Sequence, residues 1–315
     1  MRLAGVGSQM RIAVGIPTGG RPDILSCAIA CVTRQTRAPD RLAVCSFRAS
    51  ELASLAQPMV DAISPTSSGG LTHQRNTILD RCKGFDVVVF FDDDFLPHAR
   101  YLEEIERAFA ANPDVVMITG RVVADGIIGP GLSLDSARRI LDRPDIGRAG
   151  TGAEPTPETL VDVHNGYGCN MAVRMSAIEA GALRFDESLP LYGWLEDVDF
   201  SRRLAHHGRI AMCPRAIGVH LGVKSARLSG VPLGYSQVAN PLYLARKGTM
   251  ATHRALRQIL RNVAMNVARS LRPEPYIDRR GRLRGNLLGA ADLLMNRLAP
   301  TRVLHLSKKA SPIGD

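Results

Sequence analysis

The feature that most constrains this chain is a run of five large apolar residues, 87–91, that leads directly into Asp92, Asp93 and Asp94. An apolar run without alternation is typical of a parallel strand that is covered on both faces of a sheet. Ligands of open α/β sheets bind at the carboxyl ends of such strands. The stretch therefore predicts a central strand that delivers three acidic side chains to a binding site.

Three adjacent carboxylates repel one another unless water solvates them or a cation neutralises them. Mg²⁺ and Mn²⁺ prefer hard oxygen ligands, and Mg²⁺ usually binds one or two carboxylates together with substrate phosphates. The alternative is a solvated cap, because Asp is also common before a helix and residues 95–97 precede a helical pattern. On the aspartates alone, the two interpretations are equally good.

The segments around this strand alternate as in an α/β protein. Strands are predicted over 10–18 and 41–47, and the apolar residues of 24–32 recur at helical spacing between them. A short helix is predicted over 50–62 and a further buried strand over 115–120. This order predicts a mostly parallel sheet that is flanked by helices.

Two further segments carry candidate site residues. Glycines at 69 and 70 permit a close backbone approach just before a helix, where Arg75 could face a phosphate. The alternative, favoured on this piece alone, is an ordinary capped helix with an exposed Arg75. His220 follows a strand-like segment, so its imidazole could complete a coordination sphere that the aspartates begin.

The second acidic cluster lies beside Trp194, the only tryptophan. Acids in the first turn of a helix complement the helix dipole, which is a purely structural explanation for Glu196. For Asp197 we favour a function, because a carboxylate beside a tryptophan suggests a base next to a platform for a sugar ring.

The composition is that of a globular protein, with 45% hydrophobic and 22% charged residues. No apolar run reaches the roughly 18 residues of a spanning helix, and the first ten residues lack the apolar core of a signal peptide. Six cysteines without a CxxC pair predict reduced thiols rather than a zinc site. We therefore expect a cytoplasmic protein.

The net charge of +10 is concentrated in the last part of the chain. Residues 246–315 hold 15 of the 40 Lys and Arg but 4 of the 30 Asp and Glu, a net charge of +11. Apolar residues of 252–271 form one helical stripe with arginines interspersed, which predicts an amphipathic helix on an anionic membrane surface. The alternative is that these helices dock on the catalytic body or on a second subunit. Nucleic acid is disfavoured, because aromatic residues are only 5% of the chain.

Over roughly residues 10–247, the order of motifs resembles the family 2 glycosyltransferases of bacterial polysaccharide and cell-envelope synthesis, which have the GT-A nucleotide-sugar-binding fold. The matching pieces are Ile16-Pro17-Thr18, Gly70 with Arg75-Asn76, Asp92-Asp93-Asp94, the segment 168–171, Phe185-Asp186-Glu187, the segment 196–199, and His220 followed by the segment 240–243. The resemblance implies a GT-A domain over 10–247 and leaves 248–315 as a basic helical C-terminal region.

The resemblance also implies roles for individual residues. Asp94 and His220 match positions that hold Mn²⁺ or Mg²⁺, and Asp197 matches the catalytic base. Donor-binding positions are Pro17, Thr18, Arg21, Arg75, Asp92 and Asp93, and acceptor-binding positions are Trp194 and Glu196. One departure is that the second strand ends Val44-Cys45-Ser46-Phe47 where many relatives have an acidic residue for the base or ribose, so the nucleotide is not fixed by the motif.

The function implied is inverting transfer of a sugar from a nucleotide-sugar donor to a hydroxyl of a glycan, either free or lipid-linked. A nucleotidyltransferase of related fold is one alternative, although residues 19–21 are a poor phosphate loop. A non-catalytic, membrane-associated scaffold is another. The loops predicted over 125–160 and 222–238 would set the choice of sugar and acceptor.

Overall fold

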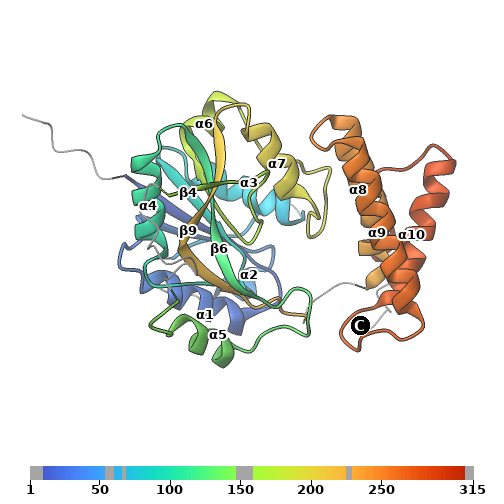
Figure 1. The fold of residues 1–315 in the computed structure, drawn as a ribbon, viewed down its shortest axis with the longest axis horizontal. Helices are drawn as coiled ribbons and strands as arrows, with labels where there is room; N and C mark the ends of the chain where they lie inside the picture. Colours follow the sequence, from blue (N-terminus) through green and yellow to red (C-terminus); the bar gives the residue numbers. More distant parts are fainter. Residues whose placement is uncertain (1–9, 54–59, 66–68, 147–158, 225–228, 309–315) are drawn as a thin grey trace, which may run out of the picture.

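The computed structural model describes residues 10–53, 60–65, 69–146, 159–224 and 229–308 of the 315-residue chain. One mixed sheet with helices around it forms the body, and a group of helices lies beside that body (Figure 1). The described strands are β1 (Ile12–Pro17), β2 (Arg41–Cys45), β3 (Val60–Ile63), β4 (Val87–Phe91), β5 (Phe95–Pro97), β6 (Val115–Asp125), β7 (Val161–Asp162), β8 (Asn170–Arg174) and β9 (Arg209–His220).

The described helices divide between the body and the helical group. Those of the body are α1 (Pro22–Thr33), α2 (Ala49–Ala53), α3 (Leu71–Arg81), α4 (Tyr101–Ala111), α5 (Leu134–Leu141), α6 (Met175–Ala180) and α7 (Glu196–Leu204). Those of the helical group are α8 (Gly230–Lys247), α9 (Thr252–Ser270), α10 (Arg279–Leu294), the 3₁₀ turn η1 (Pro300–Arg302) and α11 (Val303–Lys308).

The strands follow the order β3-β2-β1-β4-β8-β6-β9-β5, with β7 paired to β9. Pairing is parallel from β3 through β4, whereas β8 runs antiparallel to both β4 and β6. The predicted α/β architecture is confirmed, and beyond β4 the strand directions are mixed. Strand β4 lies between β1 and β8, so its carboxyl end opens at the middle of the sheet.

The sheet is covered on both faces, which explains the unbroken apolar run of β4. All five β4 side chains are fully buried. One apolar cluster joins Val87, Val89 and Phe91 to α1 and α4, and another joins Val88 and Phe90 to α3, α6 and α7. A strand with a helical layer on each face has no solvated side, and alternation is therefore absent.

The loop predicted over 222–238 is wrong over residues 230–238, which belong to α8 (Gly230–Lys247). Two further predicted elements are wrong in detail. The helix predicted over 50–62 is only α2 (Ala49–Ala53), and Val60–Ile63 is strand β3, with residues 54–59 outside the described part. The apolar residues there satisfied a helical pattern, but parallel pairing with β2 decides the conformation. The strand predicted over 115–120 extends as β6 to Asp125, into the predicted loop 125–160.

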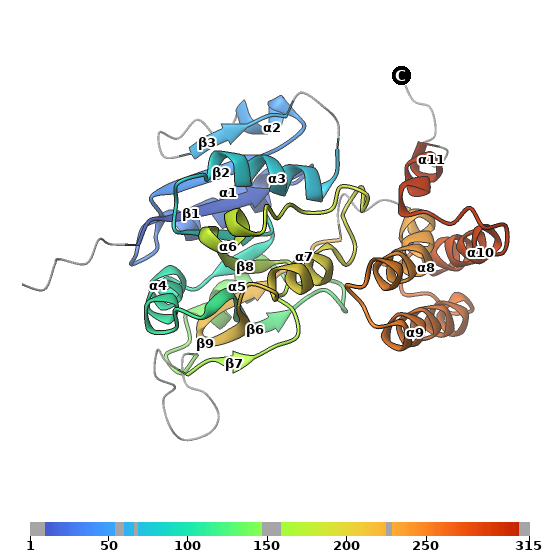
Figure 2. The ribbon, with the colours of Figure 1, turned by 90° about the horizontal axis from the view of Figure 1, so that it is seen from above.

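The helices α8, α9 and α10 pack against one another, and Figure 2 shows them as a layer apart from the sheet. A buried polar network joins all three, because Asn266 Nδ2 donates to Gln237 Oε1 and Asn286 Oδ1, each at 2.8 Å. The predicted first domain ends at residue 247, although α8 packs in this helical group. The division into domains 10–247 and 248–315 stays a prediction.

Several contacts between the helical group and the body involve α8. Tyr243 OH donates to Asp186 Oδ2 at 2.8 Å, and Lys247 Nζ lies 2.9 Å from Asp199 Oδ2. Asn240 Nδ2 donates to the backbone oxygen of Trp194 at 2.7 Å. None of the helices in the described ranges has both the length and the apolarity to cross a membrane.

The core beneath the acidic turn can be tested with Phe91→Ala. The Phe91 ring packs 5.2 Å from the Phe95 ring and 5.1 Å from the Tyr101 ring, measured between centroids. Removing a fully buried aromatic side chain leaves a cavity, so urea denaturation should show the free energy of unfolding lowered by about 3–5 kcal/mol. Leu294→Ala, at a side chain that is 88% exposed, is the control and should change it by less than about 0.5 kcal/mol.

Candidate active site

A tight turn after β4 directs three consecutive carboxylates towards different sets of partners. The turn is closed by the Phe95 N–H, which donates to the Asp92 backbone oxygen at 3.0 Å. Asp92 pairs with Arg75, Asp93 with Thr18 and Arg21, and Asp94 with Arg21 and His220. The predicted alternative of a solvated helix cap is wrong, because Asp93 and Asp94 are buried.

Asp93 lies against the end of β1, with residues predicted to bind a donor. Thr18 Oγ1 donates to Asp93 Oδ2 at 2.7 Å, and the Arg21 guanidinium pairs with both Asp93 and Asp94. Burial raises the pKa of Asp93 to about 7, against the opposing charge of Arg21. Pro17 is the last residue of β1 and pairs in register with Cys45, which places Thr18 at the sheet edge.

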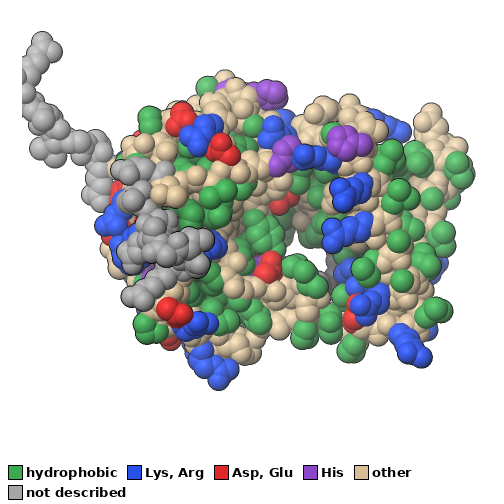
Figure 3. Space-filling view, viewed as in Figure 1, with side chains coloured by type: hydrophobic (Ala, Val, Ile, Leu, Met, Phe, Trp, Pro, Cys, Tyr) green, Lys and Arg blue, Asp and Glu red, His purple; other side chains and the backbone are tan. Residues whose placement is uncertain are grey.

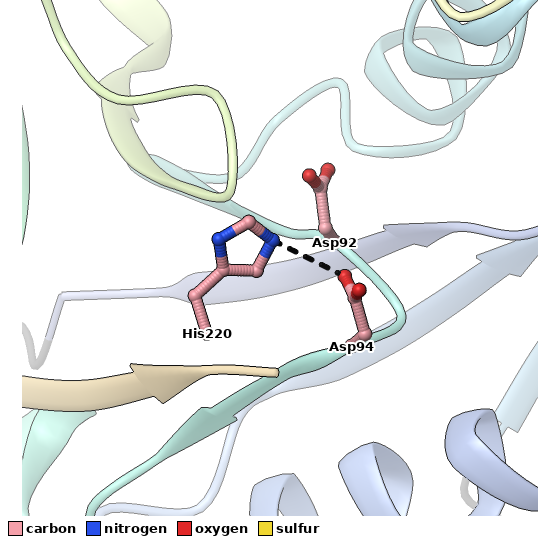
Figure 4. Close-up of side chains that lie close together, drawn as sticks. All are labelled: Asp92, Asp94 and His220. Atoms are coloured by element: carbon pink, nitrogen blue, oxygen red, sulfur yellow. Dashed lines mark ion pairs between the residues drawn. The ribbon is translucent and has the colours of Figure 1, made fainter. Parts of the chain in front are cut away.

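His220 reaches Asp94 because of strand register. In the antiparallel pair of β5 and β9, Phe95 lies opposite His220, so the residue before Phe95 is brought next to the imidazole. His220 Nε2 lies 3.5 Å from Asp94 Oδ1 (Figure 4). The predicted association of Asp94 with His220, 126 positions apart in the sequence, is thus present in the structure.

The charges of this pair stabilise each other. Burial alone would raise the pKa of Asp94, but the hydrogen bond from His220 and the charge of Arg21 lower it to about 2. Burial alone would lower the pKa of His220, but its hydrogen bonds to Asp125 and Asp94 raise it to about 10. Without a bound metal, the carboxylate is therefore ionised and the imidazole is protonated at neutral pH, and a cation that binds through Nε2 would displace that proton.

Asp125, the last residue of β6, was not predicted to belong to the site. Its Oδ1 lies 2.9 Å from His220 Nδ1, and its Oδ2 accepts a hydrogen bond from Tyr167 OH at 2.8 Å. This contact occupies Nδ1, which leaves Nε2 as the ring nitrogen that faces Asp94. Residue 125 was the first residue of a predicted loop, and for this reason no role was predicted for it.

Asp92, Asp94 and His220 each offer one ligand atom, and the three atoms lie within 4.8 Å of one another. Two carboxylates and one imidazole suit Mn²⁺ or Mg²⁺ in donor chemistry. Figure 4 shows that the three side chains lie close together, with Asp92 and Asp94 on the turn after β4 and His220 at the end of β9. The group fits a divalent cation, with Asp92 as a third ligand beside the two that were predicted.

Arg75 on α3 joins the two acidic clusters. Its Nη2 lies 3.0 Å from Asp92 Oδ1 and donates to the Gly168 backbone oxygen at 2.7 Å, and its Nη1 pairs with Glu196. The alternative of an exposed Arg75 is wrong, because its side chain is 0% exposed. Contact between Arg75 and a phosphate stays a prediction.

Asp197 is the second residue of α7 and lies next to this bridge. Its Oδ2 accepts a hydrogen bond from the Gly168 N–H at 3.1 Å, and its Oδ1 accepts one from the Val198 N–H at 2.8 Å. Burial raises the pKa of Asp197, and the two N–H groups oppose the shift. Because Gly168 also contacts Arg75, Asp197 and Asp92 belong to one connected group.

Glu196 and Trp194 were both predicted to bind an acceptor. Glu196 is buried and pairs with Arg75, and burial raises its pKa against the pull of that guanidinium. Trp194 is partly exposed in the loop before α7. Leu195, which caps α7, has a φ of 72°, a strained value for a leucine that helps to turn the chain from Trp194 into the helix. Acceptor contacts of both residues stay predictions.

A cavity of about 270 Å³ lies beside Thr18, and its lining residues are Thr18, Gly19, Gly20, Ser46, Phe47 and Arg48. Phe47 stacks on His73 with ring centroids 5.8 Å apart. Glu51 on α2 connects the loops that follow β1 and β2. Its carboxylate accepts hydrogen bonds from the Gly20 N–H at 2.8 Å and from Ser46 Oγ at 2.7 Å. Glu51 thus supplies a carboxylate next to Ser46, where the motif lacks one.

No family model matches this chain, and no curated protein is significantly similar to it in sequence. Its fold matches solved structures of S. aureus TarS. TarS 1–349 aligns with a TM-score of 0.54 and 12% identity over 93% of this chain and 82% of TarS 1–349. The complex with UDP-GlcNAc gives 0.53 and 13% over 93% and 83%, and the complex with UDP gives 0.52 and 13% over 84% and 76%.

These alignments confirm the predicted GT-A fold with its helical C-terminal region. At 12–13% identity, they establish the fold and not the chemistry. The roles of the individual site residues therefore depend on the geometry described above.

Asp125 can be tested apart from any activity. Asp125→Asn keeps the shape of the side chain but loses the charge opposite His220, so Mn²⁺ affinity measured by calorimetry should fall by about 10- to 100-fold. Asp135→Asn, at an α5 carboxylate that is 85% exposed, is the matched control and should bind Mn²⁺ like the unmodified protein. Equal Mn²⁺ affinity in the two variants would remove Asp125 from the site.

Proposed function

We propose that this chain is a metal-dependent, inverting glycosyltransferase that moves a sugar from a nucleoside-diphosphate donor to a hydroxyl of a glycan acceptor, either free or lipid-linked. The observation that carries the proposal is the Arg75 bridge, which connects an acidic group that fits a cation to a second pair of carboxylates, Glu196 and Asp197. The fold shared with TarS, which was crystallised with UDP and with UDP-GlcNAc, supports a nucleotide-sugar donor.

The donor would bind across the carboxyl ends of β1, β2 and β4. The cavity beside Thr18 has the aromatic Phe47 and the side chain of Arg48 in its lining, which suits a nucleoside. The cavity adjoins the acidic turn through Thr18, because Asp93 of that turn contacts both Thr18 and Arg21. Asp92 is 29% exposed beside this turn, and a carboxylate there suits a ribose hydroxyl or the cation.

The diphosphate would then lie over Asp92, Asp94 and His220. A divalent cation held by Asp94 and His220 would supply positive charge for the diphosphate as it leaves. Asp125 holds the imidazole with Nε2 toward that position. Arg21 is a second positive charge beside Asp94, and the guanidinium can remain near the diphosphate throughout the reaction.

Asp197 is the base in this proposal. The N–H groups of Gly168 and Val198 fix its carboxylate, and burial raises its pKa, which makes it a stronger proton acceptor than a solvated aspartate. Asp197 would take the proton of the acceptor hydroxyl while that oxygen attacks the anomeric carbon. The bond from that carbon to the diphosphate oxygen breaks in the same step, so the configuration inverts.

The acceptor side would be formed by Trp194 and by Glu196. The indole of Trp194 offers a flat apolar face of the kind on which sugar rings stack, and it lies three residues before Asp197. The charge of Glu196 is balanced by Arg75, so Glu196 adds no net charge beside Asp197. Both residues belong to the loop and first turn that the strained Leu195 connects.

The role of Asp197 is tested by Asp197→Asn. The amide retains the size of the carboxylate but cannot accept the proton, so kcat for sugar transfer should fall by about 10²- to 10⁴-fold. Binding of the nucleoside diphosphate with Mn²⁺, measured by calorimetry, should remain within a factor of about two, because Asp197 lies on the acceptor side. Full transfer by this variant would exclude Asp197 as the base.

The metal and the nucleotide are tested together by a thermal-shift screen of UDP-, dTDP- and GDP-sugars with Mn²⁺. A donor that binds the folded state raises Tm, and we expect UDP-sugars to give the largest increase. EDTA should abolish both that increase and sugar transfer, and added Mn²⁺ or Mg²⁺ should restore them. Undiminished turnover in EDTA would contradict the role given to Asp94 and His220.

A further inference from the structure

Helix α9 leaves an apolar stripe exposed to solvent. Leu256, Leu260, Val263, Val267 and Leu271 recur at intervals of three and four, which places them on one side of the helix. Leu256, Leu260, Val267 and Leu271 are 49%, 70%, 51% and 84% exposed. Single exposed apolar residues are common on proteins, but a continuous stripe of them indicates a binding surface.

The stripe is not the face that packs within the protein. Ala255 and Asn266 are the buried residues of α9, and Asn266 bonds to Gln237 of α8 and Asn286 of α10. The inner face of α9 is thus already occupied by its two neighbouring helices. The stripe lies beside that inner face. Only another molecule could therefore cover the stripe.

A row of arginines lies next to the stripe. Arg254, Arg257, Arg261 and Arg272 are exposed and recur on the adjacent side of the helix. None of the four pairs with an acid in the part of the chain that the structure describes. Helix α9 contains no acidic residue of its own. A stripe of aliphatic side chains beside a row of arginines suits a lipid membrane, which has an apolar interior and can have an anionic surface.

The charge of the whole region selects among occupants. Residues 246–315 carry 15 Lys and Arg and 4 Asp and Glu, a net charge of +11. A second copy of this chain would bring one such region against another, and like charges oppose that contact. Nucleic acid would use the arginines but leave the leucines in water, because α9 has no aromatic side chain on which bases could stack.

We infer that α9 is a membrane-docking helix that lies flat on an anionic lipid surface, with its leucines in the headgroup and acyl boundary and its arginines on lipid phosphates. Figure 3 shows hydrophobic side chains in green and basic ones in blue over the helices at the right of the molecule. The inference goes beyond sugar transfer, because it does not require any catalytic residue to be assigned correctly.

Flotation of the full chain with lipid vesicles tests this surface. The protein should bind vesicles that contain phosphatidylglycerol and not vesicles of phosphatidylcholine alone, and high salt should release it. Arg257→Gln with Arg261→Gln should lower the partition coefficient by about fivefold for each arginine. Leu260→Ser with Leu271→Ser should lower it by at least about tenfold, because their side chains would no longer enter the lipid.

Matched controls lie on the body. Arg138→Gln with Arg139→Gln removes the same charge from α5, and Ile128→Ser removes an apolar side chain that is 84% exposed, so both should bind vesicles like the unmodified protein. Sedimentation equilibrium without lipid gives the oligomeric state. The inference is overturned if the protein does not bind anionic vesicles, or if the α9 variants bind them as well as the controls do. It is also overturned if the unmodified protein is a dimer that does not bind vesicles and the leucine variant is a monomer. Each of these results leaves the transferase assignment untouched, since none of them measures transfer.

Discussion

The site depends on one buried guanidinium. Arg75 has no exposed surface, yet it carries a charge that must be balanced within the protein, and Asp92 and Glu196 balance it from two segments 104 residues apart in sequence. An isolated buried charge is so unfavourable that removing one partner of such a pair typically costs about 3–5 kcal/mol. The helix α3, the turn after β4 and the start of α7 are therefore held in one arrangement by electrostatics, and the rings of Phe90 and Phe185 pack near the guanidinium.

The pKa values of nearby carboxylates in the site are shifted in opposite directions. Asp94 has a lowered pKa because His220 and Arg21 stabilise its charge, whereas burial raises the pKa values of Asp93 and Asp197. The surroundings of each aspartate thus decide whether its pKa is lowered, so that it stays ionised, or raised, so that it accepts a proton more readily. That difference is what a transferase requires, because one carboxylate must stay charged beside a diphosphate while another accepts a proton.

Much of this arrangement could be read from the sequence. The apolar run before Asp92 located the central strand, and the order of motifs anticipated the GT-A fold and brought Asp94 and His220 together. Asp125 and Glu51 were missed, because an acid at a strand end or in a short helix carries no pattern that separates it from a solvated one. Burial of Arg75 was missed for the same reason, since its partners are fixed by tertiary contacts.

The hydrogen bond from Asn240 to the Trp194 backbone oxygen has a mechanical consequence. It ties α8 to the loop that precedes Asp197, and α8 is in turn locked to α9 by the amide network around Asn266. Hydrogen bonds between named side chains therefore connect α9 to the loop that precedes Asp197. If ligand binding beside that loop changes the membrane affinity of α9, membrane binding must change the ligand affinity by the same free energy.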